Sequence, residues 1–479
     1  MAGEGGILNM LNQEQIKAIH QTTLELLENT GVVIQEETAL SLLHEVGAKV
    51  DFGGQRARFP ACLMEKLICQ VPDHVTWYAR DPKKTVQLEG TKVCFGPAAG
   101  AVNVLDSNGK RRPATIQDAY DFCRLVDALD FVEEGHCVVY PTDAIPGSAH
   151  AHMLAAMAKF SSKPFRGRPR GREEATDSIR MAELLVGGRD ALKQRPIIFA
   201  NINPVSPLQH AREMVEGTLE FARRGLPVCF SPQVQAGTTG PVTLAGTLAQ
   251  HNAEVLSGLA IAQAANPGVP VIYGCVTSVS DMRTGGFAYG AVEGAMLNVA
   301  SVQLARYYHL PSRATSGFTE SKMLDYQCAL ESMMTNVMVC MAGPNYIQGA
   351  AGGLESSLTA SYEKMVIDDE ALGMIARAMR GISVNEDSLA SDLIAKVGPG
   401  GHYLAEGHTR THFRREIFIP KLIDRLSYEA WKAAGAKDMV ERAREKARSI
   451  LAHHQPQMIE PALALEIDQL VAEVEARHR

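Results

Sequence analysis

The chain has 479 residues, of which 46% are hydrophobic and 21% are charged, so it holds enough apolar material for a large core. Its net charge of −7 argues against a protein that binds nucleic acid through a basic surface. Nine scattered cysteines without Cys-x-x-Cys spacing argue against a disulfide scaffold or a zinc ribbon, and they predict reduced thiols in the cytoplasm. The opening residues lack the pattern of a secretory signal, and the long uncharged runs are too rich in Gly, Pro, Gln and Thr to predict a membrane span.

Residues 1–114 are predicted to form N-terminal helices and a small β subdomain. Apolar side chains at spacings of three and four predict a helix from about residue 12 and a second one over 36–46. Short β-type runs follow at 75–79, 85–88 and 102–105. Residues 106–109, with the sequence DSNG, are typical of a hairpin turn.

Residues 115–416 alternate between strand-like and helical patterns, beginning with a helix predicted over 116–128 with Thr115 as its cap. The strand-like runs, most of them separated by one helical pattern, are 131–140, 164–168, 196–203, 227–233, 270–277, 311–317, 346–351 and 402–405. Eight such units predict an α/β fold, a (β/α)8 TIM barrel. An open doubly wound sheet is the alternative, and it is disfavoured because no Gly-x-Gly-x-x-Gly follows the first strand. Residues 417–479 are predicted to form a C-terminal helical extension.

Barrel enzymes place their working residues at the carboxyl ends of the strands. The predicted strand ends carry amides, hydroxyls, arginines and aromatics, but no carboxylate pair, no lysine and no metal-ligand spacing. This argues against glycoside hydrolysis, Schiff-base chemistry and metal-assisted hydrolysis, and it favours binding over proton transfer. The aromatics could line a cage for a quaternary ammonium by cation–π attraction, although half of the side chains of any strand face the helices. The aromatic candidates are Tyr140, Phe199, Phe230 and Tyr273 at strand positions and Phe95, Phe318 and Tyr346 in loops.

Three histidines lie close together near the end of the barrel region. His408 and His412 are four residues apart and could share a helix face, but no glutamate follows His408 as in zinc proteases, and Arg410 would oppose a cation. We therefore expect His402, His408 and His412 to hydrogen-bond within a rim loop, and we expect no metal site.

Four arginines alternate over residues 166–172. They predict either contact with a small anion or partner protein, or a solvated loop, and the sequence favours neither.

The motifs GPGGHYL (398–404), HTRTHFRRE (408–416), AAGGLE (350–355) and SYEKMVIDDE (361–370) together resemble the trimethylamine methyltransferase superfamily. The resemblance covers nearly the whole chain. It implies a cytoplasmic barrel enzyme that moves a methyl group from an amine to the Co(I) corrinoid of a separate carrier protein. Because the sequence contains only standard residues and no pyrrolysine, it is similar to the branch that demethylates quaternary amines such as glycine betaine, proline betaine or carnitine-like compounds. A quaternary amine leaves as a neutral tertiary amine, which explains a rim without a general acid.

The resemblance also implies residue roles. It gives importance to an asparagine at the third strand and a polar residue, often histidine, at the seventh, which are Asn201 and Gln348 here. Arg313 or His402 would anchor a substrate carboxylate. The full set expected to bind substrate is Phe95, Tyr140, Asn201, Phe230, Gln233, Tyr273, Arg313, Gln348 and His402. The set expected to contact the corrinoid or its carrier is Arg166, Arg168, Gly352, Gly353, His408 and His412.

Further expectations are a homo-oligomer, no tightly bound metal and no nucleic-acid or membrane partner. A barrel that binds or senses a betaine without chemistry is the main alternative function. A barrel lyase or hydrolase is a more distant one.

Overall fold

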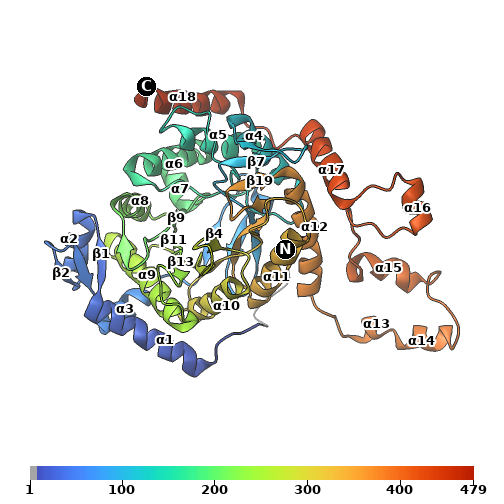
Figure 1. The fold of residues 1–479 in the computed structure, drawn as a ribbon, viewed down its shortest axis with the longest axis horizontal. Helices are drawn as coiled ribbons and strands as arrows, with labels where there is room; N and C mark the ends of the chain where they lie inside the picture. Colours follow the sequence, from blue (N-terminus) through green and yellow to red (C-terminus); the bar gives the residue numbers. More distant parts are fainter. Residues whose placement is uncertain (1–7) are drawn as a thin grey trace.

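The computed structural model describes residues 8–479 and shows a barrel of parallel strands ringed by helices (Figure 1). Six strands form one parallel sheet, in which neighbours in space are β6 (Cys94–Pro97), β17 (Tyr346–Ala351), β16 (Ser312–Thr315), β13 (Val271–Gly274), β11 (Val228–Phe230) and β9 (Ala200–Ile202). The sheet is central, and its strands run as short, largely buried segments.

Two further extended segments close this sheet into a barrel. One segment pairs with β6 through a parallel bridge between Phe95 and Val132, and the other pairs with β9 through a bridge between Gly167 and Ala200. The two segments meet each other where the amide of Gly135 donates to the carbonyl of Pro164 over 2.8 Å. The barrel therefore has eight parallel members, and the predicted (β/α)8 class is confirmed.

The predicted eighth strand at 402–405 is wrong. These residues form an exposed turn outside the barrel, and β6 supplies the missing strand from the N-terminal part of the chain. The short apolar run after a glycine turn at 398–401 imitated a strand, whereas the glycine and proline of β6 made that segment look like a loop. The predicted domain boundary at residue 114 therefore placed the barrel strand β6 in the N-terminal part. Apart from this strand, the division of the chain into three parts at residues 114 and 416 stays a prediction.

Helices follow the strands and pack around the barrel. They are α4 (Ile116–Ala128), α5 (Ala149–Phe160), α6 (Gly171–Val186), α7 (Arg189–Gln194), α8 (Arg212–Arg223), α9 (Leu244–Ala265), α10 (Val292–Tyr307), α11 (Tyr326–Ala342) and α12 (Tyr362–Met379). Helix α4 begins where predicted because Thr115 and Asp118 form a reciprocal capping box at its N-terminus. Helix α9 is buried along most of its length, because helices of the N-terminal part cover its outer side.

The N-terminal part lies against this outer side of α9. It consists of α1 (Gln13–Glu25), η1 (Leu26–Thr30), α2 (Glu37–Glu45) and α3 (Ala61–Ile68), with a small sheet of β10 (Gln209–His210), β1 (Val32–Ile34), β3 (Arg56–Arg58) and β2 (Lys49–Asp51). Helix α3 was not predicted. Because β10 belongs to the barrel region, the small sheet fastens the two parts of the chain together.

A hairpin closes the lower end of the barrel, where the strands begin. It consists of β4 (Val75–Trp77) and β5 (Val86–Leu88), with η2 (Pro82–Lys84) between them. The indole of Trp77 packs edge-on against Phe199 and Tyr346, and its N–H donates to the carbonyl oxygens of Phe165 and Ile197 over 3.3 and 3.1 Å. A ligand must therefore enter from the opposite end.

Small sheets surround that opposite end. One contains β18 (Gly353–Leu354), β19 (Thr359–Ser361), β7 (Asn103–Leu105) and β8 (Arg111–Pro113), and the other contains β12 (Gln235–Ala236), β14 (Ser278–Ser280) and β15 (Phe287–Ala288). The predicted hairpin turn at 106–109 joins β7 to β8. We call this end of the barrel the mouth.

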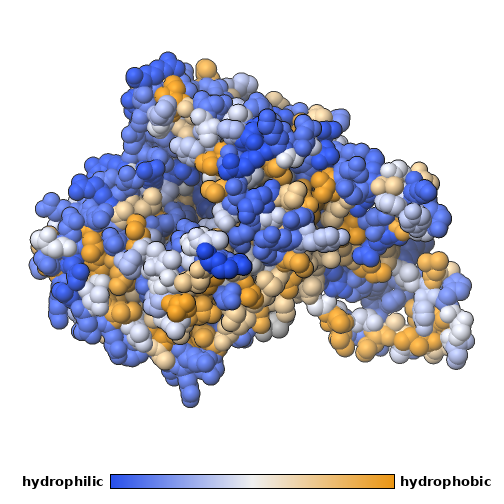
Figure 2. All heavy atoms as spheres, in the orientation of Figure 1, coloured by the Kyte–Doolittle hydropathy of each residue, from blue (hydrophilic) through white to orange (hydrophobic). Residues whose placement is uncertain are grey.

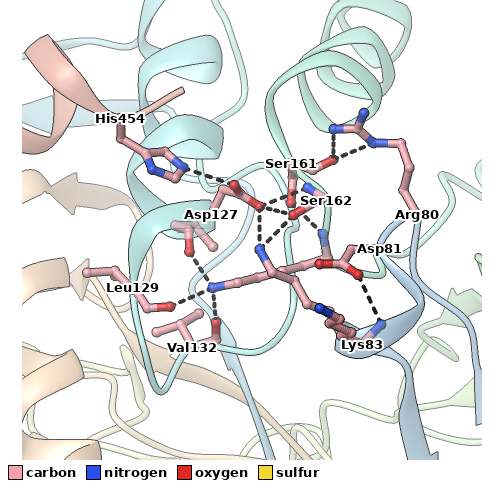
Figure 3. A network of polar contacts seen from close by, with 12 residues as sticks. Arg80, Asp81, Lys83, Asp127, Leu129, Val132, Ser161, Ser162 and His454 are labelled. Carbon is pink, nitrogen blue, oxygen red and sulfur yellow. Dashed lines mark hydrogen bonds and ion pairs between the residues drawn. The ribbon is translucent and has the colours of Figure 1, made fainter. Parts of the chain in front are cut away.

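A polar network at the lower end joins the C-terminal tail to the barrel (Figure 3). The buried carboxylate of Asp127 accepts hydrogen bonds from the amide and hydroxyl of Ser162 and faces Nε2 of His454 at 2.9 Å. Beside it, the ammonium of Lys163 donates to the backbone carbonyl oxygens of Val126, Leu129 and Val132. These carbonyls lie at and beyond the end of α4, so the lysine serves as a buried C-terminal cap.

The C-terminal region contains α13 (Glu386–Leu389), α14 (Ser391–Val397), α15 (Gly407–Glu416), α16 (Tyr428–Ala433), α17 (Met439–His453) and α18 (Pro461–Arg477). Helix α17 packs on α12 and α4, and α18 packs on α5 and α6. Residues 382–416, which we call the arm, instead project away from the barrel (Figure 1). No helix of the arm contains a buried residue. None of the helices within residues 8–479 has the length and apolar character that crossing a bilayer requires.

Candidate active site

Strand alternation sorts the barrel side chains into an inner and an outer set. In the lower part of the interior, the inner set is apolar and surrounds Trp77. Above it lies a polar layer, formed by Glu134, Arg166, Asn201, Ser231, Arg313 and Gln348. The residues expected at the third, sixth and seventh strands therefore meet in one layer beneath the mouth.

Two arginines converge on a single amide oxygen in this layer. Nη1 of Arg166 donates to Oε1 of Gln348 over 2.7 Å, and Nη2 of Arg313 donates to the same oxygen. Nη1 of Arg313 also donates to the carbonyl oxygen of Cys275 over 2.6 Å. The side chains are almost fully enclosed, with 4% of Arg166 and 1% of Arg313 exposed. A neutral amide thus takes the place that a carboxylate would usually take between two guanidinium groups.

The carboxylate of Glu134 can balance at most one of the two positive charges of Arg166 and Arg313. Its Oε1 accepts from Nε of Arg166 over 2.6 Å, and its Oε2 accepts from the hydroxyl of Tyr346. Burial raises the pKa of the Glu134 carboxyl, whereas Arg166 and Tyr346 favour its charged form. Sequence reasoning missed Glu134, although a glutamate pair inside the apolar run 131–139 was a visible signal.

Within residues 8–479, three nitrogen atoms near this layer are buried without a hydrogen-bond partner: Nη2 of Arg166, Nε of Arg313 and Nδ1 of His136. Burial, together with Arg166 and Arg168, holds the pKa of His136 well below its ordinary value, so the imidazole is neutral. Two guanidiniums against one carboxylate leave the layer with net positive charge. Unfilled donors beside a net positive charge favour a ligand with an anionic group.

Asn201 is the central residue of β9, and it lies in a cluster of amides and hydroxyls. Its Oδ1 accepts from the hydroxyl of Ser231 over 3.1 Å, and its Nδ2 donates to Oδ1 of Asn203 over 3.2 Å. Asn203 in turn donates to the backbone carbonyl oxygen of Ser231 over 2.7 Å. Both asparagines are partly exposed, so the cluster holds Asn201 in one orientation while leaving it accessible from the mouth.

Aromatic side chains stand together near the mouth. The ring of Tyr289 contacts Phe287 and Phe318, with centroid separations of 4.4 and 4.8 Å. Nε2 of Gln233 donates to the Tyr289 hydroxyl over 3.2 Å, which links this predicted residue to the aromatic group. Burial raises the pKa of Tyr289 to about 12, so its ring stays neutral and electron-rich at neutral pH. Tyr289 and Phe287 were not among the predicted residues, because their segment carried no strand or motif signal.

Three of the predicted aromatic ligands do not reach the interior. Phe95, Phe230 and Tyr273 point outward into the main core between the strands and the helices. The hydroxyl of Tyr273, for example, donates to Oδ1 of Asn252 on α9 over 2.9 Å. Their proposed substrate role is therefore wrong, because each occupies the outward-facing position of a strand. Tyr140 is partly buried beyond the last bridge of its segment.

The arginines of the run 166–172 do not form a free anion site. Arg166 lies inside the barrel, Nε of Arg168 lies 3.8 Å from Glu174, and the remaining two face carboxylates on α8. Their ion pairs join the loop before α6 to its surroundings. The prediction of carrier contact is accordingly limited to the partly exposed Arg168.

Gly352 and Gly353 are buried. A side chain at Gly352 would meet Cε of Met365 at 2.4 Å, and one at Gly353 would meet Cδ1 of Phe318 at 2.6 Å. These glycines allow close internal packing rather than approach by a carrier, so their predicted contact role is wrong.

The three histidines of the C-terminal motif lie on the arm. His402 is exposed in the turn before α15, and His408 and His412 are in α15. His402 therefore does not end a barrel strand and does not lie at the mouth of the barrel. Its predicted role in binding substrate there is wrong.

Comparison with known proteins gives a consistent set of relatives. The family described as trimethylamine methyltransferase (MTTB) matches residues 3–478. The chain is 38% identical to the glycine betaine methyltransferase of Desulfitobacterium hafniense strain Y51, over 97% of each chain. It is 37% identical to the trimethylamine methyltransferase MttB of D. hafniense strain DCB-2, over 98% of this chain and 95% of that one. Among solved structures, the monomethylamine methyltransferase (MtmB) of Methanosarcina barkeri aligns with a TM-score of 0.49 and 10% identity, over 93% of this chain and 95% of that one.

Proposed function

Because the chain belongs to the trimethylamine methyltransferase (MTTB) family, we propose that it is a methyltransferase acting on a quaternary amine that carries a carboxylate. The acceptor in this proposal is the Co(I) corrinoid of a separate cytoplasmic carrier protein. The proposed substrates are glycine betaine, proline betaine or carnitine-like compounds.

The observation that carries the proposal is the pair of buried arginines with unfilled donors. Nη2 of Arg166 and Nε of Arg313 have no partner within residues 8–479, and both guanidiniums share the neutral oxygen of Gln348. A substrate carboxylate would satisfy those donors and the excess positive charge together. The ammonium end would then lie toward the mouth, where Tyr289 and Phe318 offer aromatic faces for cation–π contact.

In this reaction the protein mainly binds and orients the substrate. The carrier's corrinoid would supply the nucleophile to which the methyl group passes, and the amine would leave uncharged with the electron pair of the broken C–N bond. The polar layer holds the carboxylate end, the aromatic group orients the N-methyl groups, and the Trp77 hairpin closes the far end of the barrel to water. This chemistry needs no acid, and the buried His136 near the polar layer is neutral.

The test is methyl transfer from glycine betaine, proline betaine and carnitine to reduced corrinoid, with the demethylated amine identified by NMR. Formation of a dimethylamino product from at least one of them is expected. A complete lack of product from the whole panel would refute the proposal.

Asn201→Ala is expected to lower kcat/KM by about 10- to 100-fold while leaving the fold intact, because one or two oriented hydrogen bonds to the substrate are lost. The cluster around Asn201 has alternative partners in Asn203 and Ser231, so the melting temperature should change little. Steady-state kinetics and thermal unfolding measure the two effects. Thr238→Ala, at an exposed residue whose hydroxyl bonds that of Ser280, is the control. Unchanged turnover in Asn201→Ala would exclude a substrate role.

We also propose a homo-oligomer in which the arm covers another copy of the chain. The arm exposes large apolar side chains, among them Ile382 at 87% and Leu404 at 86% (Figure 2). Helix α11 exposes a second apolar stripe, with Tyr326 at 89% and Leu330 at 70%. Two apolar surfaces of this size on one chain favour mutual burial between copies. Light scattering of the native protein measures the mass, and a monomer would refute this assembly.

A further inference from the structure

Three side chains on the arm converge to form a candidate metal site. Asp387 lies on α13, and His408 and His412 lie on α15, yet one potential ligand atom from each comes within 4.8 Å of the others. The two histidines are four residues apart, so they stand on one face of α15 with their ring centroids 4.2 Å apart. Arg410 is two residues from each histidine, which turns it about 200° around the helix, so it does not oppose a cation there.

The three side chains lie close together but do not hydrogen-bond to one another. Nε2 of His412 lies 3.5 Å from Oδ2 of Asp387, beyond an ordinary hydrogen bond. Nε2 of His408 is buried and has no hydrogen-bond partner within the described chain. Two ligand atoms of a tetrahedral zinc ion lie about 3.4 Å apart, given metal–ligand distances near 2.05 Å.

The arm also needs a means of holding its helices together. Helices α13, α14 and α15 have no buried residue, so hydrophobic packing within the arm contributes little to its shape. Small units without a core are commonly stabilised by a structural metal. A cross-link between Asp387 and α15 would close the loop that contains α14.

We propose that a divalent metal ion, preferably Zn²⁺, binds to Asp387, His408 and His412 and fixes α13 against α15. Two imidazoles and one carboxylate favour Zn²⁺ over Mg²⁺ or Ca²⁺, which prefer oxygen ligands. Three protein ligands leave a fourth position for water or for a group from a partner. The site stands apart from the barrel interior and is independent of the methyl-transfer proposal, and it reverses the expectation that the chain has no metal site.

The test uses the full-length protein, stripped with a chelator, incubated with Zn²⁺ and desalted, with metal content measured by mass spectrometry. We expect one zinc per chain in the parent protein and in the control His402→Gln, which removes an exposed histidine of the same arm. The double variant His408→Gln/His412→Gln should lose the bound zinc, and Asp387→Asn should weaken binding about 10-fold or more. Circular dichroism and thermal unfolding confirm that the barrel of each variant is intact.

A second readout follows the arm itself. Zinc should slow tryptic cleavage within residues 382–416 about fivefold or more in the parent protein but not in the double variant, because a cross-linked segment opens less often. Absence of zinc in the parent protein, equal zinc in the double variant, or loss of zinc from His402→Gln would each overturn the proposal.

Discussion

Arg313→Gln is expected to lower kcat/KM for glycine betaine, or for whichever carboxylated amine is the substrate, by about 100- to 1000-fold, because a buried guanidinium bonded to a carboxylate contributes about 3–4 kcal/mol. Glutamine is polar but carries no charge. The negative charge of the buried substrate carboxylate would therefore lack one of its two positively charged partners. The change removes a buried charge that already lacks one partner, so it should not destabilise the fold severely.

The comparison that isolates the carboxylate is a substrate without one. Turnover of tetramethylammonium, however slow, should change less than about threefold in Arg313→Gln if this arginine acts on the carboxylate. Arg283→Gln is the matched control, because Arg283 belongs to the loop between β14 and β15 but its side chain is 88% exposed and, among residues 8–479, pairs only with Asp281. An equal loss with both amines would show that Arg313 supports the barrel rather than the substrate.

Glu134→Ala is expected to reduce the free energy of unfolding by about 3–5 kcal/mol, because it leaves the Arg166 guanidinium buried without its carboxylate. Glu134 is fully buried, and two side chains depend on it for hydrogen bonds. This is a large share of the stability of a typical domain, about 5–15 kcal/mol. Urea denaturation followed by far-UV circular dichroism measures the change.

Two variants separate a lost ion pair from general damage. Glu133→Ala changes the neighbouring glutamate, which does not pair with Arg166, and should cost less than half as much. Adding Arg166→Met to Glu134→Ala should restore at least about 1 kcal/mol, since the unpaired charge is then removed. If the double variant is no more stable than Glu134→Ala alone, the ion pair is not the source of the effect.

The order of strands and helices could largely be predicted from the sequence. Helix α4 was placed at its observed bounds, because the cap at Thr115 and the amphipathic repeat are local signals. The eighth strand could not be placed, because the strands contain only three to six residues and carry little periodicity of their own. Whether β6 or the run at 402–405 enters the sheet depends on pairing with β17, which is a non-local property.

The positions of the candidate site residues were predicted in part. Arg313, Gln348 and Asn201 meet in the interior as expected, but Phe95, Phe230 and Tyr273 face the helices, since one residue of register decides the face. Arg166 was expected to contact the corrinoid or its carrier and lies inside the barrel, and Glu134 was not considered at all. Both errors come from treating charged residues in a strand as exposed, whereas this barrel buries them as partners of each other.

The most direct test of the central claim combines the purified protein, glycine betaine and cob(I)alamin produced by a chemical reductant, with the cobalt spectrum followed over time. The Co(I) absorption should be replaced by that of methyl-Co(III), with one dimethylglycine formed per cobalt alkylated, and Arg313→Gln should slow the change about 100-fold or more while Arg283→Gln should not. Proline betaine and carnitine are tried in the same assay. If a betaine binds with measurable affinity but no quaternary amine alkylates cobalt, the chain is a betaine-binding barrel and not a methyltransferase.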